Sequence, residues 1–154
     1  MIFDLDGTLV QTEQLKALSY ARAAAALCPT SLAEEDIMEA YKDVVGLSRQ
    51  EVATGLMRRF NLENAARVRM NEFSVSTPWQ AFIQLRLQFY DDIVSKPEVL
   101  KSHQWPYTMA LLGTARSSSC KVGLATMSRC SQVRRVLDAL ALSDAFDFIA
   151  TRDD

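Results

Sequence analysis

Apolar residues recur every three or four positions through the middle of the chain, which is the period of a helix with one buried face. Three such stripes are Leu15, Leu18 and Ala25; Val52, Leu56 and Phe60; and Phe82, Leu85, Phe89 and Ile93. The first stripe predicts a helix over about 13–27, which Pro29 would end. The other two predict buried helices that begin near residues 48 and 78.

Capping residues predict where the helices begin. A Ser-x-x-Glu spacing is typical of a capping box, in which the two side chains satisfy backbone N–H groups of the first helical turn. A proline is tolerated at the first position of a helix, so it is a second signal. The signals are Ser31 with Glu34, Ser48 with Glu51, Thr77–Pro78 and Trp105–Pro106. We expect the first of these helices to reach about Val45, before Gly46, and the last to reach about Ser117.

The pattern changes at both ends of the chain. Residues 1–5, 121–126 and 146–151 are short apolar runs bounded by polar or turn residues, which predicts three strands. A helix between the last two strands is marked by Val133, Val136, Leu137 and Leu140. The alternation of strand and helix favours a parallel sheet, and we expect the first strand to join it.

These elements predict an α/β fold with two parts. The first is a core around a parallel sheet, formed by residues 1–11 and 95–154. The second is an all-helical insertion, residues 12–94, after the first strand. The prediction requires that the first strand lie in the sheet and that the insertion contain no strand.

Composition narrows the class of protein. The 154 residues are 49% hydrophobic and 23% charged, as in ordinary globular proteins. No run approaches the roughly 18 apolar residues of a membrane helix, so we expect no membrane partner. A formal charge of -2 gives no basic surface for nucleic acid. Three cysteines without a CxxC pair, and no signal-peptide pattern, favour the reducing cytoplasm.

The candidate chemistry lies where the first strand ends. Asp4 and Asp6 follow apolar residues at the carboxyl end of a strand, the edge at which parallel α/β sheets bind ligands. Alternation along the strand would point both side chains the same way. One carboxylate could attack as a nucleophile while the other moves a proton, and their oxygens suit Mg²⁺. Gly7 would allow a sharp turn whose N–H groups bind an anion. The alternative is a solvated Asp-Gly turn without chemistry.

A second candidate is Thr126, at the end of the second predicted strand and before a helix. A hydroxyl at this position is well placed to bind an anion. The alternative, an ordinary cap at the end of a strand, is the favoured interpretation of Thr126 taken without the first motif. His103, the single histidine, is not accompanied by a Gly-x-Ser-x-Gly motif, so a serine-hydrolase triad is not indicated.

These motifs resemble those of the haloacid dehalogenase (HAD) superfamily. The segment 2–10, Ile-Phe-Asp-Leu-Asp-Gly-Thr-Leu-Val, is similar to the first motif of the family. Residues 122–128, Val-Gly-Leu-Ala-Thr-Met-Ser, resemble its second motif, and residues 146–154 resemble the strand that precedes its third. The helical insertion, residues 12–94, resembles the α-helical cap of the phosphatase and β-phosphoglucomutase branch. The resemblance implies a Rossmann-like, three-layer core in residues 1–11 and 95–154 that is incomplete at its C-terminus.

The resemblance implies a role for each matching residue. Asp4 would be the nucleophile that forms an aspartyl phosphate, and Asp6 would be the general acid and base. Mg²⁺ would bind the Asp4 carboxylate and the Asp6 backbone carbonyl. The phosphoryl group would be bound by Thr126 and by the N–H of Met127. The presence of Asp6 favours phosphoryl transfer, because dehalogenases proper lack the second acid of the first motif.

The resemblance also implies groups that residues 1–154 do not contain. The family's third motif supplies a lysine and its fourth supplies acids that complete the Mg²⁺ site, both further along the chain. We therefore expect this sequence to be the front portion of an enzyme, inactive by itself. In the family the missing strands lie beside the first strand, whose edge would otherwise be unpaired. Asp153 and Asp154 could replace the missing acids, but loop residues are the favoured interpretation.

Three basic residues of the cap are candidates for substrate binding. Lys16 stands where the mutase branch has a histidine. Arg49 lies in a segment that resembles the mutase loop for the distal phosphate, and Arg86 begins a pattern like Lys-x-x-x-Tyr. Arginine matches phosphate geometry with two hydrogen bonds, but charged helix residues are more often solvated.

Three functions remain open. The leading hypothesis is a Mg²⁺-dependent hydrolase of small phosphate monoesters, with a small phosphorylated metabolite such as a sugar phosphate as substrate. A sugar-phosphate mutase is the second, and the lysine at position 16 weighs against it. The third is an inactive fragment or an interaction module.

Overall fold

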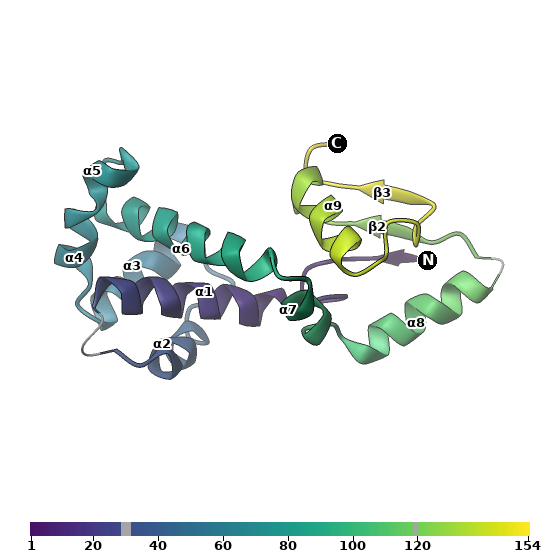
Figure 1. The fold of residues 1–154 in the computed structure, drawn as a ribbon, viewed down its shortest axis with the longest axis horizontal. Helices are drawn as coiled ribbons and strands as arrows, with labels where there is room; N and C mark the ends of the chain where they lie inside the picture. Colours follow the sequence, from purple (N-terminus) through teal and green to yellow (C-terminus); the bar gives the residue numbers. More distant parts are fainter. Residues whose placement is uncertain (29–31, 119) are drawn as a thin grey trace. The chain divides into compact units, whose positions relative to one another are not determined.

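The computed structural model describes residues 1–28, 32–118 and 120–154 and contains both helices and strands (Figure 1). The strands are β1 (Ile2–Phe3), β2 (Gly123–Ala125) and β3 (Phe148–Ala150). The helices are α1 (Thr12–Leu27), α2 (Glu34–Tyr41), α3 (Arg49–Arg59), α4 (Glu63–Val68), α5 (Met70–Phe73), α6 (Pro78–Val94), α7 (Pro97–Ser102), α8 (Pro106–Ser117) and α9 (Cys130–Ala139).

The chain forms two compact units. One comprises Met1–Glu13 together with Val94–Asp154, and the other is Gln14–Ile93. The three strands belong to the first unit, and within the described part of the second unit there are only helices. None of the described helices is long and apolar enough to cross a membrane.

The sheet of the first unit has the order β1-β2-β3, and both pairs of strands are parallel. Ile2 pairs with Gly123, and Gly123 in turn pairs with Phe148. The predicted α/β fold with the first strand in a parallel sheet is therefore confirmed. The strands are shorter than the predicted apolar runs. Beyond them the pairing continues only through single backbone hydrogen bonds, such as the one from the Gly123 N–H to the Met1 carbonyl.

The helix predicted from Ser31 to Val45 differs at both ends. Residue 31 lies outside the described residues, and the helix begins only at Glu34, with Ala33 as its N-cap. It ends at Tyr41, because the next N–H groups donate to carbonyls three residues back and form turns rather than a continued α-helix. The predicted capping box at Ser31 therefore lies outside the described residues, and Ala33 makes no side-chain hydrogen bond to the first turn.

Other boundaries follow the sequence signals closely. Ser48 caps α3 with both hydrogen bonds of a capping box: its Oγ accepts from the Glu51 N–H, and the Glu51 carboxylate accepts from the Ser48 N–H. Pro78 and Pro106 stand at the first positions of α6 and α8. The short helices α4, α5 and α7 were not predicted, since segments of four to six residues are too short to show a clear period.

Each unit has its own apolar core. In the second unit, Tyr20 of α1 lies 5.5 Å from Tyr41 of α2 and 5.7 Å from Phe82 of α6, measured between ring centroids. The first unit buries the inward residues of its strands and of α9, which include Phe3, Leu5, Leu124, Val133 and Leu137. The second and third predicted stripes face the core of the helical unit, which buries Val52, Leu56, Phe82 and Leu85, whereas Leu18 and Ala25 of the first stripe are only half-buried. Burial of apolar surface is the main force that holds each unit together.

Candidate active site

The segment after β1 is a tight turn. Gly7 adopts a φ of +75°, a left-handed conformation that a glycine adopts without strain. Its N–H donates to the Val10 carbonyl at 2.7 Å, and the N–H groups of Leu9 and Val10 donate to the Leu5 carbonyl. The contribution of Gly7 is therefore the turn itself, since its own N–H is already used within it.

Burial alternates along this segment. Phe3 and Leu5 are buried, whereas Asp4 is exposed and Asp6 is half-buried. One carboxylate oxygen of Asp4 accepts a hydrogen bond from the Leu5 N–H at 2.7 Å. Two buried apolar residues thus anchor the segment, and the carboxylates occupy the positions between and after them.

Asp6 is linked to the end of β2. Its Oδ2 accepts hydrogen bonds from the hydroxyl of Ser128 at 2.5 Å and from that of Thr126 at 3.4 Å. The carboxyl ends of β1 and β2 meet at one edge of the sheet because these strands are parallel neighbours. The structure therefore brings Asp6 together with Thr126.

Ser128 was not identified from the sequence. It stands two residues after Thr126, and its N–H donates to the Thr126 hydroxyl at 3.2 Å. The side chain of Met127, between them, is 80% exposed. A second hydroxyl within the segment Thr-Met-Ser was the only available signal, and serine is too common in turns for that signal to be specific.

Asp153 and Asp154 take part in hydrogen bonds of the loop after β3. A carboxylate oxygen of Asp153 accepts from the N–H of Cys130 at the start of α9, at 2.8 Å. The Asp154 carboxylate accepts from the N–H and the hydroxyl of Thr151, and the N–H bond in particular holds the pKa of this carboxyl below its usual value. These contacts account for both acids as loop residues.

The donor set near Asp4 suits a hard cation. Asp4 and Asp6 each retain one carboxylate oxygen that accepts no hydrogen bond from the described residues. Oxygen ligands of this kind fit Mg²⁺, which usually binds one or two carboxylates and completes its octahedral shell with water or substrate. No group of three or more His, Cys, Asp or Glu residues that could hold a metal occurs in the described ranges.

The basic candidates of the second unit have different surroundings. Lys16 of α1 is half-buried, and Arg49, the first residue of α3, is exposed. Arg86 of α6 is only 6% exposed. Burial lowers the pKa of the Arg86 guanidinium, the nearby Tyr20, Tyr90 and Tyr41 oppose this shift, and the positive charge of Arg49 adds to it.

Aromatic rings surround Arg86. Its guanidinium carbon lies 4.6 Å from the centroid of the Tyr90 ring and 5.1 Å from that of Tyr20. The buried Nε has no hydrogen-bond partner among the described residues. Burial also raises the pKa of the Tyr20 hydroxyl, against the opposing effect of Arg86 and Arg49. Arg86 is therefore a buried cation with an unsatisfied donor, a group that an anion would stabilise.

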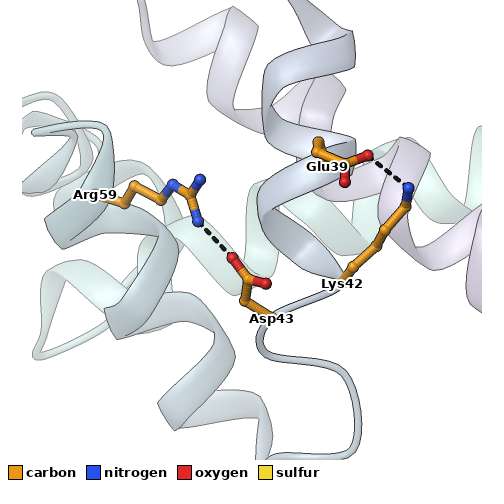
Figure 2. Close-up of polar contacts among 4 residues, drawn as sticks. All are labelled: Glu39, Lys42, Asp43 and Arg59. Carbon is orange, nitrogen blue, oxygen red and sulfur yellow. Dashed lines mark hydrogen bonds and ion pairs between the residues drawn. The ribbon is translucent and has the colours of Figure 1, made fainter.

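A separate pocket of about 370 Å³ lies between α2 and α3. Asp43 and Arg59, which line the pocket, form an ion pair at 2.7 Å (Figure 2). A second ion pair joins Glu39 of α2 to Lys42, the residue after this helix, at 2.5 Å. The side chains of both pairs are more than half exposed, so each contributes little to stability. No residue predicted to bind substrate lines this pocket.

A family model described as haloacid dehalogenase-like hydrolase matches residues 1–154. The chain belongs to this family. The sequence has no match among curated proteins.

Solved structures with the same fold include hydrolases and phosphatases. A protein described as a β-phosphoglucomutase from Thermotoga maritima is 21% identical to this HAD-like chain, with a TM-score of 0.66. One described as a phosphoglycolate phosphatase from Haemophilus somnus is 15% identical, with a TM-score of 0.60. The HAD-hydrolase YfnB from Bacillus subtilis, solved in a form bound to magnesium, is 16% identical, with a TM-score of 0.56.

The chain spans less than two thirds of these structures. They cover 99%, 98% and 99% of the chain, whereas the chain covers 60%, 61% and 64% of them. At these identities the comparisons show that the fold is shared.

Proposed function

We propose that this HAD-like chain provides the nucleophile and the general acid of a Mg²⁺-dependent phosphohydrolase that acts on small phosphate monoesters. The observation that carries the proposal is the contact of Asp6 with the Thr126 and Ser128 hydroxyls at the edge where β1 and β2 end. Such an edge is where α/β sheets bind ligands. The exposed Asp4 stands two residues before Asp6 in the same segment.

The first chemical step is nucleophilic attack. An Asp4 carboxylate oxygen attacks phosphorus, the bond from phosphorus to the ester oxygen breaks, and Asp6 gives its proton to that leaving oxygen. The product is an alcohol and a phosphoryl group on Asp4. The Thr126 hydroxyl and the Met127 N–H, which donates to no acceptor among the described residues, bind the phosphoryl oxygens.

The second step restores the enzyme. Asp6, now a carboxylate, takes a proton from water, and the water oxygen attacks phosphorus. The bond between Asp4 and phosphorus then breaks, which releases inorganic phosphate. Mg²⁺, held by the Asp4 carboxylate and the Asp6 backbone carbonyl, would supply positive charge that offsets the charge of the phosphoryl oxygens. The oxygen donors at Asp4 and Asp6 fit such an ion.

Besides the phosphoryl group that is transferred, the proposed substrate has anionic or polar groups that basic residues of the second unit bind. Lys16, Arg49 and Arg86 bind the substrate through its anionic or polar groups. In support, Arg49 is exposed, and Arg86 is buried with an Nε that has no hydrogen-bond partner among the described residues. A small phosphorylated metabolite such as a sugar phosphate would satisfy them. We also propose a cytoplasmic location, since the three cysteines of the sequence form no CxxC pair.

A sugar-phosphate mutase is the second candidate, because a mutase must bind two phosphate groups and the second unit contains the cationic pair Arg49 and Arg86. The same phosphoryl-Asp4 would then pass its phosphoryl group to a substrate hydroxyl rather than to water. An interaction module without activity is the third candidate.

The test uses the chain continued along its reading frame through the lysine and acidic motifs that the family resemblance implies; we call this the extended chain. It is incubated with a panel of sugar phosphates and simple phosphate monoesters, with millimolar Mg²⁺ or with a chelator. We expect phosphate release that requires Mg²⁺. Isomerised sugar phosphate without phosphate release would favour the mutase, and no reaction with any ester would contradict both enzyme proposals.

A further inference from the structure

Two hydroxyl groups share one oxygen of Asp6. The Ser128 hydroxyl donates to Oδ2 at 2.5 Å and the Thr126 hydroxyl donates to the same atom at 3.4 Å. Oδ1 accepts no hydrogen bond from the described residues. The carboxylate is therefore held through one oxygen, chiefly by Ser128, and presents the other.

Ser128 is itself fixed by its backbone. Its N–H donates to the Thr126 hydroxyl at 3.2 Å, and its carbonyl accepts from the N–H of Arg152 at 3.1 Å. Thr126 is anchored in turn, because its N–H donates to the Ala150 carbonyl at 3.0 Å. Ser128 is thus tied to the ends of both β2 and β3, and these contacts give its hydroxyl a defined direction.

The hydroxyls of Thr126 and Ser128 differ in how strongly they bind Asp6. The Thr126 distance of 3.4 Å is beyond the roughly 2.5–3.0 Å of an ordinary hydrogen bond from a hydroxyl, whereas 2.5 Å is typical of a strong hydrogen bond to a carboxylate. The Thr126 hydroxyl can therefore rotate to another acceptor at little cost. The Ser128 hydroxyl stays with Asp6.

We infer that Ser128 is a positioning residue: its hydroxyl fixes Oδ2 of Asp6, so that Oδ1 exchanges the proton with the leaving oxygen while Thr126 turns to the phosphoryl group. This inference rests on the proposed function. It assigns Thr126 to the transferred group and Ser128 to the acid, a division that the sequence motif alone does not reveal.

The inference predicts a dependence on the leaving group. An alkoxide leaves only if it receives a proton, whereas p-nitrophenolate leaves without one. A misplaced Asp6 would therefore slow the cleavage of an alkyl phosphate far more than that of p-nitrophenyl phosphate. A variant that merely weakened the fold would reduce both rates by the same factor.

The first experiment measures kcat/KM of the extended chain with glycerol 2-phosphate and with p-nitrophenyl phosphate, since kcat/KM reports the step in which the leaving group departs. In Ser128→Ala we expect a loss of about tenfold or more with the alkyl ester and of less than about threefold with the aryl ester. Ser128→Thr, which keeps a hydroxyl, should recover most of the loss. Ser131→Ala, an exposed serine of α9, is the matched control and should change neither value. Equal losses with both esters, or none, would overturn the inference.

The second experiment does not depend on activity. Three-bond NMR couplings about χ1 of Asp6 are measured in residues 1–154 and in the Ser128→Ala variant. We expect a single rotamer in the parent and averaged couplings in the variant. If Ser128→Ala does not fold, Ser128→Cys replaces it, because a thiol has similar size but is a weaker donor. Unchanged couplings would overturn the inference even if the esters are not hydrolysed, and an inactive parent with averaged couplings in the variant would contradict only the proposed function.

Discussion

Arg86 of α6 lies against Tyr90, one turn further along the same helix, with its guanidinium carbon 4.6 Å from the ring centroid. Arginine over an aromatic ring is a favourable contact, but it does not replace the hydration that a buried charge loses. The pKa of Arg86 is accordingly lowered, mainly by burial. The helical unit thus contains a buried cation that contacts two aromatic rings but whose Nε donates to no acceptor among the described residues.

The first prediction concerns this cation. Arg86→Met replaces a 6% exposed charge by an apolar side chain of similar length, so the free energy of unfolding should be unchanged or rise by about 1–2 kcal/mol. Urea denaturation measures it. Arg67→Met, in the exposed pair with Glu63, is the control and should change stability by less than about 0.5 kcal/mol.

The same pair of variants tests anion binding by the second unit. Inorganic phosphate should raise the melting temperature of the parent and of Arg67→Met, because an anion that binds the native state stabilises it. The shift should disappear in Arg86→Met. A loss of more than about 2 kcal/mol in Arg86→Met without phosphate would show that the cation is a structural requirement instead.

The second prediction concerns the start of α3, which places Arg49. Ser48→Ala removes the acceptor for the Glu51 N–H and should cost about 1 kcal/mol of stability. Gln50→Ala, an exposed position of the same turn, is the control. An equal effect of both substitutions would refute the importance of the cap.

The cap should also depend on pH. Hydrogen bonds from Ser48 hold the pKa of Glu51 below its ordinary value of 4.5. Because the folded pKa is the lower one, this stabilisation is complete above the ordinary value and is lost as pH falls through the lowered one. The difference in stability between the parent and Glu51→Gln should therefore shrink as the pH falls from 7 to about 3. A difference that grows on acidification would contradict the assignment.

The third prediction compares two glycines. A Cβ at Gly123 in β2 would lie 2.0 Å from Cζ of Phe148, whereas one at Gly113 in α8 would meet nothing within 4 Å. Gly123→Ala should therefore destabilise the chain by about 1–3 kcal/mol, because the ring must move. Gly113→Ala should stabilise it by about 0.5–1 kcal/mol through helix propensity. Thermal unfolding distinguishes them, and Phe148→Ala should remove most of the cost at Gly123 if the ring is its cause.

The outline of the fold could be predicted from the sequence because its signals are local. The capping box at Ser48, the prolines at 78 and 106, and the apolar stripes are properties of neighbouring residues. The end of α2 at Tyr41 could not be predicted, since Val44 continues the apolar pattern while the backbone forms turns. Local propensity does not determine whether the residues after Tyr41 continue the helix or form turns.

The candidate site combines local signals with contacts between distant parts of the sequence. Asp4, Asp6 and Thr126 could be chosen because each follows an apolar strand, and the structure links Asp6 to Thr126. Their catalytic roles remain predictions. Ser128 could not be found, because its importance depends on a contact across 122 residues of sequence. The burial of Arg86 also depends on packing by α1, which the sequence of α6 alone does not show.

The fourth prediction concerns residues 1–154 alone. Phosphoryl transfer depends on charges that surround the transferred group, and the family resemblance places a lysine and further acids later in the sequence. We expect no measurable hydrolysis of p-nitrophenyl phosphate by residues 1–154 with millimolar Mg²⁺, and clear hydrolysis by the extended chain. Similar rates would mean that residues such as Lys16, Arg49, Asp153 or Asp154 replace the later groups.

The central claim is that Asp4 is the nucleophile, and one comparison tests it most directly. In the extended chain with Mg²⁺, kcat for p-nitrophenyl phosphate is measured for the parent, for Asp4→Asn and for Asp144→Asn, an exposed acid of the same unit. An amide cannot attack phosphorus, so Asp4→Asn should lose all measurable turnover while its circular dichroism spectrum stays that of the parent. Asp144→Asn should retain the parental rate. Turnover by a folded Asp4→Asn protein near the parental rate would contradict the account.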